Sequence, residues 1–172
     1  MQFPEVEFGS RASMESALRK IRRAMKCDRE AARALLVISS KMEGIYSELE
    51  PYFRDYIEPF CKNCPTPCCV NRHGFPDFED LIFLNACGRN LNEFDFACAD
   101  TDMCQYLGSN GCRLARCARS YRCTWYFCDE VLDRFESEHS ASFMKFDELM
   151  HKLASERAKL IKKFESLWSH LA

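Results

Sequence analysis

The sequence predicts a mainly α protein in which two long helices, expected to form an antiparallel pair, flank a small, irregular, cysteine-rich module. Apolar residues recur at steps of three and four over residues 13 to 58 and again over residues 129 to 171, which is the spacing of one face of an α-helix. Between these segments, residues 60 to 128 hold 11 of the 12 cysteines. We therefore divide the chain into an N-terminal helical segment (1–58), the module (59–128) and a C-terminal long helix (129–172).

The first helical segment carries an apolar stripe with a break before Asp28. Ser10 or Ser13 is expected to cap its start, and Asp28 to cap the part after the break, because their side-chain oxygens accept free amide hydrogens. Pro51 and Pro59 are expected to kink and then end the helix, since proline has no amide hydrogen to donate. The stripe consists of Met14, Leu18, Ile21, Met25, Ala32, Leu35, Met42, Tyr46, Leu49, Phe53, Tyr56 and Phe60.

The second helical segment is expected to be one helix, because neither Gly nor Pro occurs between Asp129 and Ala172. A straight helix of this length would span about 60 Å. Its apolar stripe cannot stay exposed, so we expect the two long helices to pair with each other, or with a protein partner such as a second copy of the chain. The stripe consists of Leu132, Phe135, His139, Phe143, Phe146, Met150, Leu153, Leu160, Phe164, Leu167 and Leu171.

Within the module only short elements are expected. Asp77 can cap a short helix over residues 78–87, which Gly88 would close. Residues 103–107 and 112–115 are expected to form a β-hairpin, since the Asn-Gly pair between them favours a tight turn.

Composition narrows the function classes. The chain has 172 residues, 47% of them apolar, and a net charge of −2. No strong charge therefore points to nucleic acid, and the longest aliphatic run, Ala34 to Ile38, is far too short to span a membrane. Residues 1–9 lack the basic and apolar regions of a secretory signal. We therefore expect a cytoplasmic protein whose thiols stay reduced, in which clustered cysteines indicate metal ligands; disulfides would be the alternative if the chain were exported.

The sharpest motif is a group of four cysteines within nine residues, in the pattern Cys-x2-Cys-x3-Cys-Cys. Two cysteines separated by two residues let both thiolates reach one ion, and Pro65 and Pro67 stiffen the loop. Four thiolates suit either zinc or an iron–sulfur cluster. These predicted metal ligands are Cys61, Cys64, Cys68 and Cys69.

A second group of cysteines follows. Cys104 and Cys112 flank the expected hairpin, so their thiols could be brought together. Cys123 and Cys128 lie among aromatic side chains that could exclude water from a metal centre. We predict these four as metal ligands and leave Cys117 open.

Further positions are less specific as ligands. Cys98 and His73 are each left open between ligand and ordinary residue, whereas Cys27 and Cys87 lie in expected helices and are predicted to be core residues.

The order of these motifs resembles the zinc- or iron-chelating cysteine-cluster (CxxCxxCC) family, to which flagellin N-methylase is related. The resemblance covers about residues 61 to 128 and includes an acidic helix after the cysteine pair. The chain differs from the family pattern in having three residues before that pair, Ser120 in place of proline and Thr124 in place of arginine. The resemblance to the methylase implies an iron–sulfur centre. By position, the family resemblance implies ligation by Cys61, Cys64, Cys68, Cys69, Cys104, Cys112 and Cys123.

Four arginines recur every three residues among the cysteines of the module. They are expected either to offset the charge of metal thiolates or to bind an anion such as phosphate. The positions are Arg113, Arg116, Arg119 and Arg122.

Three functions remain open from sequence. The first is a metal-binding protein with a thiolate-ligated zinc or iron–sulfur (4Fe–4S) centre and no further role defined. The second is an iron–sulfur-dependent enzyme or electron carrier, with methyl transfer as in the methylase. The third is a helical protein that binds a partner and uses metal only structurally. Zinc and iron–sulfur cannot be separated by sequence, because both accept four thiolates; colour would separate them.

Overall fold

A computed structural model describes residues 3–61, 64–65, 67–89, 93–109 and 111–169. Its elements are α1 (Arg11–Cys27), α2 (Arg29–Tyr52), the π-helix η1 (Phe53–Ile57), α3 (Glu58–Cys61), α4 (Asn71–Gly74), α5 (Phe78–Ala86), β1 (Leu107–Gly108), β2 (Gly111–Cys112), the 3₁₀-helix η2 (Arg116–Ala118), α6 (Arg122–Trp125), α7 (Asp129–Glu138) and α8 (Ser140–Trp168). The protein is mainly α, as predicted.

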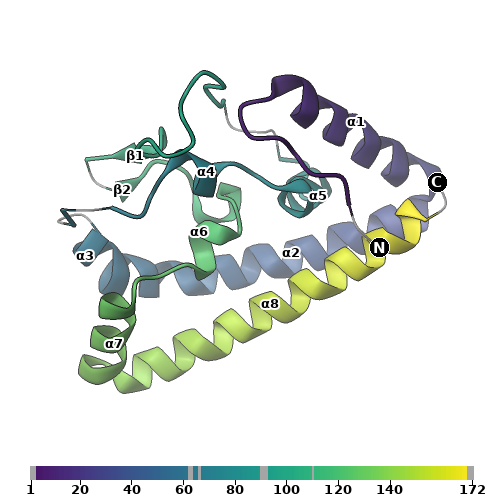
Figure 1. The fold of residues 1–172 in the computed structure, drawn as a ribbon. Helices are drawn as coiled ribbons and strands as arrows, with labels where there is room; N and C mark the ends of the chain where they lie inside the picture. Colours follow the sequence, from purple (N-terminus) through teal and green to yellow (C-terminus); the bar gives the residue numbers. More distant parts are fainter. Residues whose placement is uncertain (1–2, 62–63, 66, 90–92, 110, 170–172) are drawn as a thin grey trace.

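The long helices α2 and α8 pack antiparallel along their length and form the base of the molecule (Figure 1). Helices α1 and α5 lie on one side of this pair, and the short elements of the module lie beside them, over the end where α2 finishes and α8 begins. The predicted antiparallel pair is therefore confirmed, and it forms within a single chain.

The caps of the N-terminal helices follow the predicted pattern. Ser10 accepts a hydrogen bond from the Ser13 amide at the start of α1, and Asp28 accepts one from the Ala31 amide at the start of α2. Asp28 has an extended backbone (φ −139°, ψ 106°), which separates the two helices at the expected break. Local sequence thus determines both starts.

The predicted end of the first segment at Pro59 was wrong by two residues, because α3 continues to Cys61. The chain widens into the π-helix η1 between α2 and α3. In a π turn each amide bonds to the carbonyl five residues earlier instead of four, and here the Glu58 amide bonds to the Phe53 carbonyl. This turn lies just before Pro59, whose ring in a regular α-helix would press on the carbonyl four residues earlier. The helix can therefore pass the proline and deliver Cys61 to the module.

The predicted single helix over residues 129–171 was also wrong within the described part, because α7 and α8 are separated at His139 (φ −141°, ψ 47°). The break lets Phe135 and Phe146 approach to 5.5 Å between ring centroids. In one straight helix, residues eleven positions apart would lie about 16 Å apart along the axis. Phe135 also stacks on Tyr56 at 4.6 Å. Aromatic packing against η1 therefore turns α7 away from the axis of α8.

The core is continuous between the long helices and the module. Leu35 of α2, Leu81 of α5 and Leu153 of α8 are all fully buried in one apolar cluster. Asp77 caps helix α5 as expected and also forms a capping box with Asp80, and the C-terminal turn of the helix is followed by Gly88 (φ 66°). Burial of this helix against α1, α2 and α8 anchors the module to the helical pair.

One buried arginine joins α8 to the start of α5. An Nη atom of Arg157 lies 3.0 Å from a carboxylate oxygen of Glu79 and 3.6 Å from one of Asp80. Asp80 in turn accepts a hydrogen bond from the Tyr121 amide at 3.1 Å. This chain of contacts fixes the segment just before Cys123 relative to the long helices.

The hairpin is shorter than predicted. β1 and β2 pair antiparallel in the register Leu107 with Cys112 and Gly108 with Gly111. Gly111 has φ 98°, a left-handed conformation that suits glycine. Asn110 of the predicted turn lies outside the described residues. Among the residues described, no helix is both long and apolar enough to cross a membrane.

Candidate metal centre

The two groups of predicted ligands are brought together by a short backbone connection. Val70 forms an antiparallel bridge with Met103, and the Cys104 amide donates a hydrogen bond to the Cys69 carbonyl at 2.9 Å. The adjoining Cys68 and Cys69 therefore lie beside the segment that carries Cys104.

Asn71 locks this connection. Its side chain is almost fully buried (1% exposed), donates to the Ala99 carbonyl at 2.9 Å and accepts from the Gln105 amide at 2.8 Å. The amide group thus ties the segment after the cysteine pair to the segment around Cys104. Sequence analysis did not single out Asn71, because nothing local distinguishes it from a solvent-exposed loop residue.

An outer cavity of about 640 Å³ opens beside α3 and the start of α7. Its walls include the apolar Phe60, Pro67 and Val131 and two charged residues, Glu130 and Arg134. Cys128 precedes the first residue of α7, where the helix N-terminus favours negative charge. The cysteines lining the outer cavity are Cys61, Cys64, Cys68, Cys69 and Cys128.

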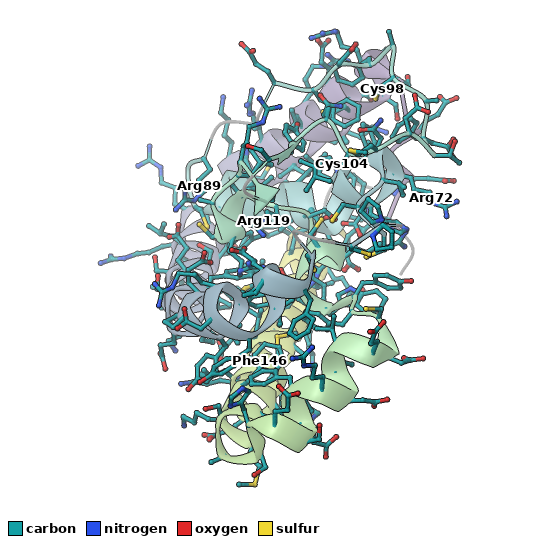
Figure 2. The ribbon with its side chains drawn as sticks, turned by 90° about the vertical axis from the view of Figure 1, so that its left-hand side faces the viewer. Arg72, Arg89, Cys98, Cys104, Arg119 and Phe146 are labelled. Carbon is teal, nitrogen blue, oxygen red and sulfur yellow. The ribbon has the colours of Figure 1, made fainter. Side chains whose placement is uncertain are left out.

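An inner cavity of about 90 Å³ lies between α4, the hairpin and α6. Its walls include His73, Arg119, Arg122 and Tyr126. Figure 2 labels Cys104 and Arg119 near the middle of the module, between Arg72 and Arg89, which extend to opposite sides. The cysteines lining the inner cavity are Cys68, Cys69, Cys104, Cys112 and Cys123.

All eight predicted ligands therefore line one cavity or the other, although they come from segments far apart in the sequence. Every cysteine of the chain is a free thiol in the structure. In the part of the chain that the structure describes, no three Cys, His, Asp or Glu side chains already converge closely enough to hold an ion. The thiols line shared cavities but do not converge on a point, so metal binding would require their side chains to move.

The cysteines of each cavity also affect one another electrostatically. Partial burial, followed by the neighbouring thiols of Cys68 and Cys128, raises the pKa of Cys61 to about 11. Burial and the thiols of Cys104 and Cys112 raise the pKa of Cys123 to about 12. At neutral pH both groups are protonated, so a metal ion would have to displace their protons.

The remaining cysteines take no part in either cavity wall. Cys98 accepts a hydrogen bond from the Gln105 side chain at 3.4 Å, and Cys117 is half-buried against the core. Cys87 is half-buried at the end of α5. The prediction that Cys27 is a core residue was wrong: it lies exposed at the end of α1, where the helix turns its last face to solvent.

His73 lies at the inner cavity, and its side chain is held by a backbone carbonyl and an aromatic ring. It lines the inner cavity, and its Nδ1 atom lies 3.0 Å from the Cys68 carbonyl oxygen. Its ring also contacts Tyr126, with centroids 5.5 Å apart. A hydrogen bond at Nδ1 orients the ring and leaves Nε2 as the free ring nitrogen.

The four arginines do different things. Arg119 and Arg122 line the inner cavity, while Arg113 is exposed and hydrogen-bonds the Gln105 carbonyl. Arg119 also donates from Nε to the Leu114 carbonyl at 2.9 Å. Arg116 is instead buried away from the thiols against two glutamates. Their three-residue spacing did not predict this division, because the four residues lie on different elements: Arg113 follows β2, Arg116 starts η2, Arg119 follows η2 and Arg122 starts α6.

Comparison with protein-family models, with curated proteins and with solved structures finds no match to this chain. The resemblance of residues 61–128 to the cysteine-cluster family therefore stays a prediction from the motif.

Proposed function

We propose that this chain binds metal through cysteine thiolates gathered in the module of residues 59–128. The observation that carries the proposal is that eight of the twelve cysteines line two adjoining cavities. Buried free cysteines that only fill space would scatter through the apolar core. Here the long helices already supply an apolar core, and most of these thiols lie outside it.

The chemistry of the donors fits zinc or an iron–sulfur cluster. Both accept four thiolates, and zinc takes them at about 2.3 Å in a tetrahedral arrangement. Arg119 and Arg122, which line the inner cavity, would offset part of the negative charge that four thiolates place on a zinc ion. Ligation by reduced thiolates fits the reducing interior of a cell, the location that we propose for the chain.

A specific observation favours a second candidate, an iron–sulfur-dependent enzyme or electron carrier. The outer cavity has a volume of about 640 Å³, far more than one ion occupies, and Cys61, Cys64 and Cys128 in its wall are exposed. An open centre of this kind can exchange electrons or bind a small molecule, whereas purely structural sites are closed. The methyl transfer implied by the resemblance would belong to this second candidate.

The third candidate, a partner-binding helical protein with structural metal, has less structural support than the first two. The predicted apolar stripes are largely occupied, because α2 and α8 pack on each other. Single apolar side chains such as Leu36 and Met144 remain exposed on these helices, which is ordinary for a protein surface.

Metal analysis of the chain purified without oxygen tests the proposal. We expect stoichiometric zinc or iron, with a brown colour and absorption near about 400 nm if the centre is iron–sulfur. A variant with Cys61, Cys64, Cys104 and Cys123 all changed to Ser should be colourless and metal-free, while Cys27→Ser should match the unaltered chain. Circular dichroism checks that the long helices remain. Absence of both metals from the unaltered chain, or full metal in the fourfold variant, would contradict the proposal.

A further inference from the structure

We propose that the module holds two separate four-thiolate metal centres and that the adjacent Cys68 and Cys69 supply one ligand to each. The outer centre would use Cys61, Cys64, Cys68 and Cys128; the inner centre would use Cys69, Cys104, Cys112 and Cys123. This inference rests on the proposed function and adds the number of centres and the division of their ligands.

The eight thiols are distributed symmetrically between the two cavities. Three cysteines line only the outer cavity and three line only the inner one. Cys68 and Cys69 line both, so this pair forms the wall between them. Each cavity thus has three thiols of its own and needs one from the pair to reach four, the number that a tetrahedral zinc ion or a 4Fe–4S cluster takes.

The backbone and the burial of Cys68 and Cys69 assign one of the two residues to each cavity. The Cys69 carbonyl accepts the Cys104 amide, which holds Cys69 beside a cysteine of the inner cavity. Cys69 is half-buried, as Cys112 and Cys123 are. Cys68 is exposed, as the three cysteines unique to the outer cavity are. The Val70 amide donates to the Cys68 carbonyl across a three-residue turn centred on Cys69, so the backbone changes direction between the two cysteines.

The two cavities differ in size and in the burial of their assigned thiols. The inner cavity is small, about 90 Å³, and the four cysteines assigned to it are half-buried or buried. A small site with buried thiols suits a single structural ion such as zinc. The outer cavity is about seven times larger by the two volumes, 640 and 90 Å³, and has exposed thiols. The outer centre therefore has room for a cluster and is open to exchange with solvent.

Native mass spectrometry, which counts bound metal centres on the intact chain, tests the division. We expect two centres on the unaltered chain. The outer pair variant, Cys61→Ser/Cys128→Ser, should keep one centre, and so should the inner pair variant, Cys104→Ser/Cys123→Ser. Cys27→Ser and Cys87→Ser, which match the outer and inner cysteines in exposure, should keep both. If the inner pair variant fails to fold, the outer pair variant still decides, because it must lose one centre and retain the other.

The assignment of the adjacent cysteines has its own test in the background of the outer pair variant. Adding Cys68→Ser should cost no further metal, since its centre is already lost, whereas adding Cys69→Ser should remove the remaining centre. The opposite result would overturn the assignment. A single centre on the unaltered chain, or loss of all metal from the outer pair variant, would overturn the two-centre proposal while leaving metal binding intact; an unaltered chain without metal would instead remove the proposed function.

Discussion

The guanidinium carbon of Arg116 lies 3.3 Å from the ring centroid of Phe53, so a cation from the module is stacked on the first residue of the π-helix. The same guanidinium donates hydrogen bonds to Glu50 at 3.0 Å and to Glu58 at 3.1 Å. Its side chain is only 3% exposed, and burial lowers its pKa to about 10, which still leaves it charged at neutral pH. In the sequence, η2 lies between Cys112 and Cys123 of the inner cavity. Arg116 therefore attaches η2 to the helical segment that ends at Cys61.

Replacing Arg116 should destabilise the protein. Arg116→Ala removes a buried cation and leaves two carboxylates and an aromatic face without their partner, and we expect a loss of about 2–3 kcal/mol in the free energy of unfolding. The loss is held below that of a fully buried pair because Glu50 and Glu58 are 44% and 32% exposed and can be hydrated. Urea unfolding measures the change.

The matched control is Arg19→Ala, which breaks an exposed helix-surface pair with Glu15 and should change stability very little. Arg116→Lys should fall between the two variants, because an ammonium group keeps the charge but lacks the planar, forked guanidinium that stacks on Phe53 while reaching both carboxylates. Equal stability of the Arg116→Ala and Arg19→Ala variants would show that the contacts of Arg116 with Phe53, Glu50 and Glu58 together stabilise the fold no more than an exposed pair.

A single methyl group at Gly74 should disturb the inner centre without unfolding the chain. A Cβ atom added there would lie 2.9 Å from Sγ of Cys104, closer than the two atoms can approach, so the thiol must rotate away. We expect Gly74→Ala to weaken metal binding at the inner centre by about 10-fold or more, since small displacements around a metal ligand have effects of this size. Competition with a chromophoric chelator measures the affinity.

Gly44→Ala is the control for this substitution. Gly44 lies in α2 and nothing lies within 4 Å of an added Cβ. The change should leave metal affinity unaltered and stabilise the helix by about 0.5–1 kcal/mol, because alanine loses less conformational freedom on folding. If Gly74→Ala binds metal as tightly as Gly44→Ala, Cys104 is not a ligand.

Metal uptake should release protons and should weaken as pH falls. Burial and neighbouring thiols raise the pKa of Cys69 and of Cys123 to about 12, above the usual value of a thiol. These groups carry protons below that pH, and each must lose its proton to bind, so a lower pH favours the unbound form. At pH 7 we expect about four protons per zinc ion.

An indicator dye in weakly buffered, reduced protein records these protons during a zinc titration. The outer pair variant should release about half as many protons in total, because one four-thiolate centre is lost. Two or fewer protons per zinc ion on the unaltered chain would mean that thiols are not the main ligands.

Removing the metal should disorder part of the module and spare the helical core. Structural thiolate sites contribute about 10–16 kcal/mol of apparent binding free energy at neutral pH, so the short elements around the two cavities are expected to depend on metal. Helix α5 should stay protected, because Leu81 and Ile82 are fully buried against the long helices. Circular dichroism should therefore retain most of its helical signal after chelation.

Limited trypsin digestion locates the disordered segments. New cuts are expected after the exposed Arg72, Arg113 and Arg122. Trypsin cannot report on α5 (Phe78–Ala86), which contains no lysine or arginine. Hydrogen exchange measures the protection of α5 instead. Loss of all helical signal in one transition would show instead that the metal module and the long helices fold as one cooperative unit.

Much of the fold could be predicted because its signals are local. The three-and-four spacing of apolar residues is a property of single helices, and Asp28 and Asp77 cap helices through bonds to amides three residues away. The break at His139 could not be predicted, since no Gly or Pro marks it. It depends on contacts of Phe135 with Tyr56, a residue of η1 that lies far earlier in the sequence.

The sequence by itself determined the helical pair and the identity of the eight candidate thiols, because periodicity, caps and cysteine spacing act over a few residues. Only the tertiary structure decided which thiols share a cavity. The backbone hydrogen bond from the Cys104 amide to the Cys69 carbonyl and the buried side chain of Asn71 bring the segments together. The physical reason is that a metal site needs donors a few ångströms apart in space. For donors on different segments, such as Cys69 and Cys104, the distance along the chain carries no information about their spacing in the folded structure.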